Sequence, residues 1–315
     1  FDDPVSMYIP EFADPHVLER YDPETGDRVT RPASREVTLH DLLTHTSGIQ
    51  YGFNGNPFRE IYGRAGIPDL GTEKPRTIEQ TMAALGRLPL SHDPGERFTY
   101  GLNTDVLGRV VEVASGMPLD VYFQTYIFEP LGMRDTGFYL PGREVDLTTL
   151  YTTYNGSLVP LPDDMSTIIT PDFPVQGAMT YFSGGAGLTS TVRDYAVFLQ
   201  ALADGGSWNG SRILSPESVA LMGTNQIGDL RVGSNGFGYG LEITTPEGAE
   251  EGLRPVGSLS WGGAFQTTYW IDPAHDMVVV MMTQMLTSPH RNTLYDRFER
   301  ALYAAVRPRD GAAAE

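Results

Sequence analysis

The chain has 315 residues, enough for one large domain or two closely associated ones with a sizeable core. Its formal net charge of −18, from 22 basic and 40 acidic residues, argues against a nucleic-acid partner, because phosphate backbones attract basic surfaces. Cysteine is absent from the sequence, which excludes disulfides, thiolate nucleophiles and cysteine-based metal sites. The longest apolar run, residues 277–282, is far too short to span a bilayer.

The N-terminal part alternates polar segments with a short helical pattern. Residues 14–35 are polar, with a turn signal at 22–27, and predict a surface excursion. Residues 38–45 predict a short helix with Thr38 as its N-cap. Residues 52–75 are rich in Gly and Pro and predict a long loop, a kind of segment that often carries function in compact domains.

The middle of the chain is predicted to be helical. Residues 77–86 begin with a capping box formed by Thr77 and Gln80. Residues 104–114 place a set of apolar side chains at helical spacing, and this set predicts a buried face: Val106, Leu107, Val110, Val111 and Val113. Further helices are predicted over residues 119–128, 191–203 and 215–223.

After about residue 235 the pattern changes to strands rich in aromatic and β-branched residues. The predicted strands cover residues 237–243, 256–261, 265–271 and 277–282, with hairpin turns at 262–263 and 272–275. A closing helix over residues 292–306 has apolar residues on one face: Leu294, Phe298, Ala301, Leu302 and Ala305.

This order of elements predicts an α/β (α+β) fold, in which an antiparallel sheet is flanked by helices and joined to a helical domain. We expect a single unit over residues 1–315. It is mainly helical over about residues 15–235, and it forms a sheet with a C-terminal helix over about residues 236–307. Residues 308–315 are expected to be a tail.

One candidate for chemistry is Tyr100, which lies at a predicted junction between a loop and a helix, where functional side chains concentrate. A tyrosine acts as a general base only if nearby positive charge lowers its pKa well below about 10. Leu102 and Asn103 follow it, and Asn103 has two interpretations, a helix N-cap or a residue that approaches a site.

Four segments, in their order and spacing, resemble the serine β-lactamase and penicillin-binding-protein superfamily. They are Leu-Leu-Thr-His-Thr-Ser-Gly at 42–48, Tyr-Gly-Leu at 100–102, the glycine-rich run at 184–191 and Trp-Gly-Gly at 261–263. The variants at 100–102 and 261–263 resemble family VIII carboxylesterases most, which are class C β-lactamase-like esterases and acyltransferases. The resemblance spans nearly the whole chain and implies a β-lactamase-like fold and a serine acyl-enzyme cycle.

The resemblance also implies roles for individual residues. Tyr100 is implied to handle a proton, and the backbone N–H of Ala264 to stabilise an oxyanion. Other residues are implied to bind substrate: Trp261, Gly262, Gly263, Tyr51, Leu102 and Asn103. The two glycines would let the backbone approach a substrate carbonyl, although a plain hairpin turn is the alternative. His45 is expected to pack as a structural residue, and Ser183 is a minor candidate for the pocket.

The nucleophile that the family needs is not among these residues. The one lysine is Lys74, and Gly71 stands three positions before it, so the chain contains no Ser-x-x-Lys motif. Residues 1–10 resemble the segment that follows the nucleophile helix in the family. We therefore expect the nucleophilic serine and its lysine in an N-terminal segment of the same protein that is missing from this sequence.

Three functions remain open at this point. The first is a carboxylesterase or acyltransferase acting on a small-molecule ester, because Trp261 replaces a lysine and offers an apolar wall to neutral esters. The second is a β-lactamase or D-amino-acid peptidase or amidase, which predicts a cation at the pocket, either Arg254 or Arg291. The third is a non-catalytic penicillin-binding-like homologue.

The expected partners are few. The histidines outside residue 45 show no metal-ligand spacing, and no dinucleotide or phosphate-binding motif is present, so we expect no cofactor and no metal. We expect no nucleic-acid partner and no membrane span. The sequence leaves the oligomeric state open, with a homo-oligomer among the alternatives.

Overall fold

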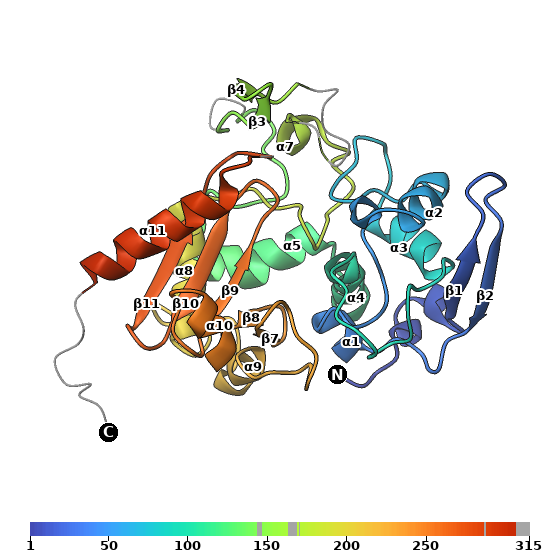
Figure 1. Ribbon diagram of the computed structural model, residues 1–315, viewed down its shortest axis with the longest axis horizontal. Coiled ribbons are helices and arrows are strands. Elements are labelled where there is room, and N and C mark those ends of the chain that lie inside the picture. Colours follow the sequence, from blue (N-terminus) through green and yellow to red (C-terminus); the bar gives the residue numbers. More distant parts are fainter. Residues whose placement is uncertain (144–146, 163–168, 170, 287, 307–315) are drawn as a thin grey trace. The chain divides into compact units, whose positions relative to one another are not determined.

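The computed structural model describes residues 1–143, 147–162, 169, 171–286 and 288–306 (Figure 1). The chain divides into two compact units. Unit 1 consists of Phe1–Glu129, Arg134–Asp146 and Asp163–Ser190, and unit 2 of Pro130–Met133, Leu147–Pro162 and Thr191–Glu315. The predicted tail, residues 308–315, lies outside the described residues.

Unit 1 begins with two short 3-10 turns and an antiparallel hairpin. The turns are η1 (Val5–Met7) and η2 (Pro10–Phe12), and the hairpin pairs β1 (His16–Tyr21) with β2 (Arg28–Pro32). Between the strands, the Asp22 carboxylate accepts hydrogen bonds from two backbone N–H groups. The predicted turn is confirmed, and the polar excursion around it is a two-stranded ribbon.

Helix α1 (Leu39–Leu43) begins as predicted, because Thr38 and Asp41 form a reciprocal capping box. The predicted loop that follows is wrong in part, since it contains η3 (Gly52–Asn54) and helix α2 (Phe58–Ala65). The apolar residues of α2 recur at spacings of three and four, and Phe58, Ile61 and Tyr62 bury one face of it in the core. Gly and Pro at the ends of this segment concealed that periodicity.

Unit 1 contains further helices, and those over residues 78–86 and 103–115 bury side chains in the same core. The further helices are α3 (Ile78–Gly86), α4 (Asn103–Ser115), α5 (Leu119–Phe123), the π-helical turn η4 (Gln124–Phe128) and α7 (Phe173–Gln176), with α6 (Glu129–Leu131) at the boundary with unit 2. The capping box predicted for α3 is confirmed.

The predicted buried face of α4 needs a correction. Its buried residues are polar as well as apolar, with Asn103, Asp105, Val106, Gly108 and Val110 turned inward. The last turn of the helix projects toward solvent, where a valine predicted to be buried is 40% exposed. The buried face of α4 is set by the segments that pack against the helix, and the spacing of its valines alone did not predict which face that is.

Unit 2 contains an antiparallel sheet with the strand order β11-β10-β9-β8-β7. Its strands are β7 (Gly236–Phe237), β8 (Glu242–Ile243), β9 (Leu259–Gly262), β10 (Thr268–Asp272) and β11 (Met277–Met281). Both predicted hairpins are confirmed, but the first turn lies later than predicted, because Gly262 belongs to β9 and pairs with Thr268 of β10. The single strand predicted over 237–243 is instead a hairpin of β7 and β8, because a turn separates them.

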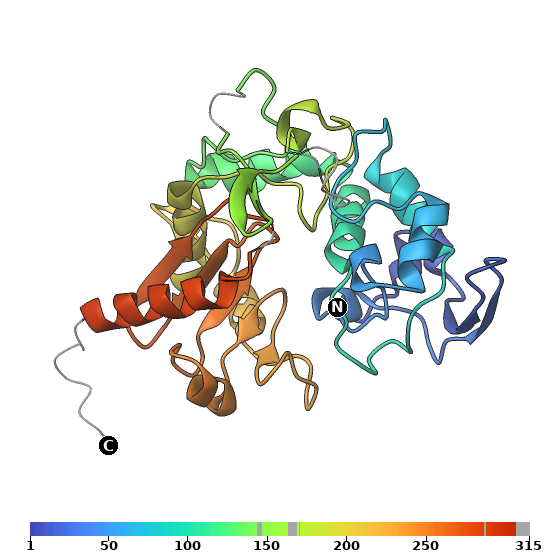
Figure 2. The same cartoon turned by 45° about the horizontal axis from the view of Figure 1, so that its top comes forward.

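Two long helices cover opposite faces of this sheet, α8 (Val192–Ala203) and α11 (Arg291–Ala305) (Figures 1 and 2). Neighbouring residues of β10 make the contacts, since successive side chains of a strand point to opposite faces. Tyr269 packs against Tyr195 of α8, and Trp270 donates a hydrogen bond to Tyr303 of α11 at 3.1 Å. Thr191 caps α8, because its side chain accepts a hydrogen bond from the backbone N–H of Asp194.

The face predicted for the closing helix is wrong in part. Leu294 is 39% exposed, whereas Phe298 packs against Trp270 as predicted, and Tyr303, which was not predicted, does so too. The Tyr303 hydroxyl accepts a hydrogen bond from Trp270 and donates one to Asp272, so a tyrosine can occupy this buried face where a pattern of aliphatic residues does not predict it. The rest of unit 2 consists of α9 (Pro216–Met222), α10 (Pro246–Glu251) and two small hairpins, β3 (Tyr151–Tyr154) with β4 (Ser157–Pro160) and β5 (Ser207–Trp208) with β6 (Ser211–Arg212).

Candidate active site

Tyr100 lies at the end of the loop that leads into α4. Its backbone carbonyl accepts a hydrogen bond from Asn54 Nδ2 at 2.9 Å, and its side chain is half-buried. A Cβ atom at Gly101 would collide with the backbone oxygen of Ile49, so only glycine lets the loop pack this closely. The position of Tyr100 is therefore set by the backbone on both sides.

The side chain of His45 packs against the side chain of Tyr100. The two rings meet edge to face with centroids 4.9 Å apart. Burial lowers the pKa of His45 to about 3, so its imidazole is neutral at physiological pH. Asn103 Nδ2 donates a hydrogen bond to His45 Nδ1 at 2.9 Å, which assigns the proton of the ring to the other nitrogen. These contacts fit the structural role expected for His45.

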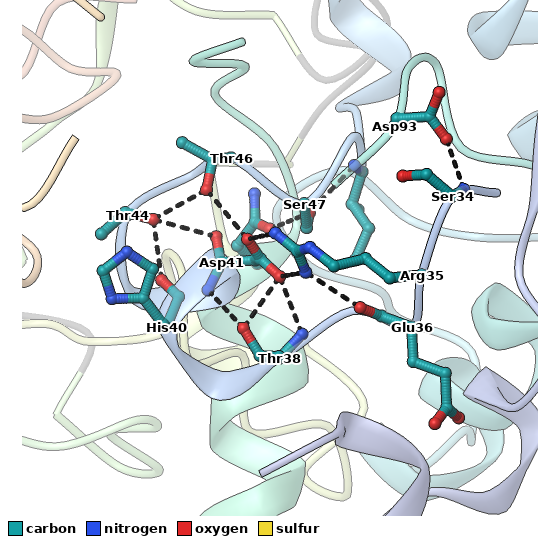
Figure 3. Close-up of polar contacts among 12 residues, drawn as sticks. Ser34, Arg35, Glu36, Thr38, His40, Asp41, Thr44, Thr46, Ser47 and Asp93 are labelled. Atoms are coloured by element: carbon teal, nitrogen blue, oxygen red, sulfur yellow. Dashed lines mark hydrogen bonds and ion pairs between the residues drawn. The ribbon is translucent and has the colours of Figure 1, made fainter. Parts of the chain in front are cut away.

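The segment that carries His45 is held by a buried carboxylate (Figure 3). Asp41 accepts two hydrogen bonds from the Arg35 guanidinium, at 2.5 and 2.8 Å, and further ones from Thr38 and Thr46. Burial by itself would raise the pKa of Asp41, but the hydrogen bonds from Arg35 and Thr38 and the charge of Arg35 outweigh it, and the pKa is lowered. Asp41 is thus an ionised anchor.

Three residues expected to bind substrate are buried around Tyr100. Tyr51, Leu102 and Asn103 each have no exposed surface. The Tyr51 ring lies 5.1 Å from that of Tyr100, and the Asn103 side chain is hydrogen-bonded to Ser47 as well as to His45. Asn103 is the first residue of α4, and Leu102 occupies the N-cap position without a side-chain cap.

Asp105 is a polar residue of this region that the sequence analysis missed. It lies in the first turn of α4, is fully buried, and accepts a hydrogen bond from Ser183 Oγ at 2.6 Å. Ser183 in turn accepts the backbone N–H of Ala186 at 3.1 Å, which ties the glycine-rich segment to the helix. A single acidic residue among the apolar positions of α4 was the available signal in the sequence.

The environment of Asp105 disfavours its charged form. Burial raises its pKa to about 7, although hydrogen bonds from Ser183 and the Gly185 backbone oppose the shift. Within the described residues, Asp105 Oδ2 has no hydrogen-bond partner of good geometry. A carboxyl group that titrates near neutral pH beside Tyr51 is a feature expected of functional sites.

The segment around Trp261 belongs to unit 2. This residue lies in β9 opposite Tyr269 of β10, and its ring meets Phe237 edge to face at 5.3 Å. A Cβ atom at Gly263 would collide with Thr267 Oγ1, and one at Gly262 would lie 2.9 Å from the Thr267 oxygen. The absence of side chains at Gly262 and Gly263 therefore makes room for Thr267 of the same turn.

Ala264 follows these glycines at an exposed position of the turn. Its backbone N–H makes no hydrogen bond to any part of the chain that the structure describes. A free, exposed amide is what the implied oxyanion donor requires.

The two arginines considered as pocket cations have other neighbours. Arg254 donates to Glu299 Oε1 at 2.6 Å and lies 4.4 Å from the centre of the Trp270 ring. Arg291 lies 5.5 Å from the centre of the Tyr295 ring. Across the described ranges, no group of three or more acidic or histidine side chains is arranged to hold a metal. No described helix has both the length and the apolar character that crossing a membrane requires.

Residues 1–304 match the family model described as Beta-lactamase, and the chain belongs to this family. Protein Rv1367c of Mycobacterium tuberculosis is 33% identical, over 90% of this chain and 70% of that protein. Esterase EstB of Burkholderia gladioli is 29% identical, over 97% of this chain and 74% of the esterase.

Among solved structures, the chain is similar to EstCE1, described as a hydrolase with promiscuous acyltransferase activity. The identity is 28%, the TM-score is 0.77, and the match covers 96% of this chain and 77% of EstCE1. The predicted β-lactamase-like fold, with an antiparallel sheet flanked by helices and a helical part, is confirmed.

Proposed function

We propose that this protein is a serine carboxylesterase that works through an acyl-enzyme intermediate, with acyl transfer to an alcohol as a second outcome of the same intermediate. The observation that carries the proposal is the setting of Tyr100. Tyr100 is the first residue of the Tyr-Gly-Leu motif, and its ring packs against neutral His45 and buried Tyr51. The names of EstB and EstCE1 support serine hydrolase activity.

The proposed cycle assigns the residues as follows. A serine attacks the ester carbonyl, and Tyr100 together with a lysine takes the serine proton and passes it to the departing alcohol. The backbone N–H of Ala264 donates a hydrogen bond to the oxyanion. Water then attacks the acyl-serine ester, which releases the carboxylic acid and regenerates the serine.

The serine and the lysine are the part of the proposal that these 315 residues do not supply. The chain has no Ser-x-x-Lys motif, because its one lysine follows Gly71 by three positions. We propose that both residues come from a segment of the protein that is not among these residues.

Neutral esters are the proposed substrates. Trp261 offers an apolar surface at the motif position where the family's β-lactamases carry a cation. Arg254 is paired with Glu299, so it does not offer a free charge for a substrate carboxylate. We therefore propose that short-chain carboxylic esters are preferred over penicillins.

The test is labelling with a fluorophosphonate probe followed by intact mass, together with hydrolysis of p-nitrophenyl butyrate and of nitrocefin. With the protein in a form that includes the segment carrying the proposed Ser-x-x-Lys motif, we expect one adduct per protein, and hydrolysis of the ester in preference to the lactam. Tyr100→Phe should lower kcat/KM for the ester by about 10²- to 10⁴-fold, the usual range for loss of general acid–base catalysis. Tyr126→Phe, at a tyrosine that is 48% exposed, is the matched control and should leave kcat/KM unchanged. A protein that gains no adduct and hydrolyses no ester would overturn the proposal.

A further inference from the structure

A buried polar cluster, formed by Tyr51, Asp105 and Ser183, contacts Tyr100 through the ring of Tyr51. Asp105 follows Tyr100 by five residues and faces the core from the first turn of α4. Its Oδ1 accepts the Ser183 hydroxyl at 2.6 Å, whereas its Oδ2 lacks a partner of good geometry within the described residues. A buried oxygen left in this state costs free energy, so its retention calls for an explanation.

The hydroxyl of Tyr51 has the same property and faces the same point. Its oxygen also lacks a hydrogen bond of good geometry in the described part of the chain, although a side-chain hydrogen bond with Tyr100 is among the causes that raise its pKa. A Cβ atom at Gly185 would lie 2.6 Å from Asp105 Oδ2, 2.8 Å from the Tyr51 hydroxyl and 2.9 Å from Thr104 Oγ1. The absence of a side chain at Gly185 therefore leaves room in which a carboxyl and a phenol converge.

Tyr51 connects this cluster to Tyr100. Its ring is stacked on Phe53 with centroids 4.5 Å apart, and it meets the Tyr100 ring at 5.1 Å. Because Tyr51 has no exposed surface, its ring moves only if its neighbours move. A change in what its hydroxyl binds is thus transmitted to Tyr100.

We propose that Asp105, acting through Tyr51, is a positioning residue for Tyr100 in the ester hydrolysis proposed above. The inference rests on that proposed function. Asp105 itself is not a catalytic residue, because the contact with Tyr100 is made by Tyr51.

The protonation state of Asp105 decides which group can donate across this space. A neutral carboxyl offers its O–H to the Tyr51 oxygen, whereas an ionised carboxyl offers Oδ2 as an acceptor for the Tyr51 O–H. The charge-assisted form is the stronger of the two and holds Tyr51 more firmly. Since burial raises the pKa of Asp105 to about 7, the exchange between the two forms falls in the neutral range.

The other titratable groups around the cluster do not change state in that range. Burial raises the pKa of Tyr51 and of Tyr181 well above 10, and the charge of Asp105 raises both further. The charge of Arg76 acts in the opposite sense and lowers the pKa of Tyr181. His45 beside Tyr100 is neutral, because burial lowers its pKa to about 3.

The experiment measures kcat and KM for p-nitrophenyl butyrate from pH 5.5 to 9, with the protein in a form that hydrolyses this ester. We expect kcat of the unmodified protein to rise with pH through a step near 7. Asp105→Asn should remove the step and lower kcat at pH 8 about tenfold, with KM changed by less than about twofold. Ser183→Ala should move the step to higher pH, because it removes a hydrogen bond that stabilises the carboxylate.

Tyr51→Phe keeps the ring and removes the hydroxyl, so it should flatten the step while Asp105 still titrates in a carboxyl ¹³C NMR experiment. The matched control is Asp272→Asn in unit 2. Asp272 is equally buried but satisfied by His275 and Tyr303, so its loss should lower stability and leave the pH step in place.

Three results would overturn the inference. One is a pH profile that is the same in Asp105→Asn and in the unmodified protein. Another is a step that Ser183→Ala leaves unmoved, which remains decisive if Asp105→Asn does not fold. The third is absence of ester hydrolysis by the unmodified protein, which overturns the proposed function and this inference with it, whereas the first two leave the proposed function standing.

Discussion

Unit 1 contains two buried aspartates that the fold treats in opposite ways. Asp41 is surrounded by donors: Arg35 contributes two hydrogen bonds, and Thr38 and Thr46 add more (Figure 3). Asp105 is just as buried but has one good hydrogen bond, from Ser183. Burial alone therefore does not decide whether a carboxylate stabilises a protein; the number and charge of its donors do.

The difference gives the two residues opposite effects on stability as the pH changes. The pKa of Asp41 is lowered by folding, so its contribution is present above about pH 4 and is lost as the pH falls through its folded-state pKa. The pKa of Asp105 is raised to about 7, so the native state holds a proton that the unfolded chain has lost. The free energy of unfolding is therefore unaffected by Asp105 below about pH 4, is lowered increasingly as the pH rises, and is lowered by the full amount above pH 7.

The largest effect is expected from Asp41→Asn. Removal of the charge leaves the Arg35 guanidinium without its counter-ion and should lower the free energy of unfolding by about 3 kcal/mol at pH 7. Urea denaturation of the variant and of the unmodified protein, at pH 7 and at pH 3.5, measures this change in the free energy of unfolding. The loss should shrink at the lower pH, and a loss of the same size at both would contradict the assignment of Asp41 as an ionised anchor.

Asp105→Asn should act in the other direction. The full shift in pKa corresponds to a cost of at most about 4 kcal/mol at high pH, and relaxation of the site reduces what is recovered. We expect a gain of about 2 kcal/mol in the free energy of unfolding at pH 8 and none at pH 4.5. A loss of stability at pH 8 would show that the hydrogen bonds to the carboxylate outweigh the cost of burying its charge. A gain together with slower catalysis is the usual trade-off at a functional site.

Gly185→Ala tests the space in which Asp105 and Tyr51 meet. The new methyl group would lie 2.6 Å from Asp105 Oδ2, so we expect a loss of about 2 kcal/mol from overpacking. Gly63→Ala is the matched control, because nothing lies within 4 Å of a Cβ in that helix position. It should be neutral or stabilise by up to about 1 kcal/mol, and equal effects of the two changes would mean that the cluster is not close-packed.

The smallest effect is expected from Thr38→Ala, which removes the N-cap of α1 and should cost about 1 kcal/mol. Thr77→Ala, at the equivalent position of α3, is the comparison. Thr38 also donates to Asp41 at 2.8 Å, so its replacement should cost more than that of Thr77 and should raise the pKa of Asp41. Thermal melts of both variants at pH 7 check the order, and the reverse order would argue against a coupled network.

Much of the fold follows from local patterns. The caps at Thr38 and Thr77 and both hairpins of the sheet are confirmed, because their hydrogen bonds join residues close together in the chain. The motif segments around Tyr100 and Trp261 identified the family for the same reason, since each is a short run with its own geometry. The roles proposed for these residues stay predictions.

The sequence by itself therefore determined where most helices and turns begin, the antiparallel sheet and the family. Only the tertiary structure decided which polar residues are buried and what they meet there. Asp105 pairs with Ser183, 78 positions away, and Gly185 brings it to Tyr51. The free-energy cost of burying a charge depends on every segment packed around it. Residues adjacent in the chain do not reveal which segments those are.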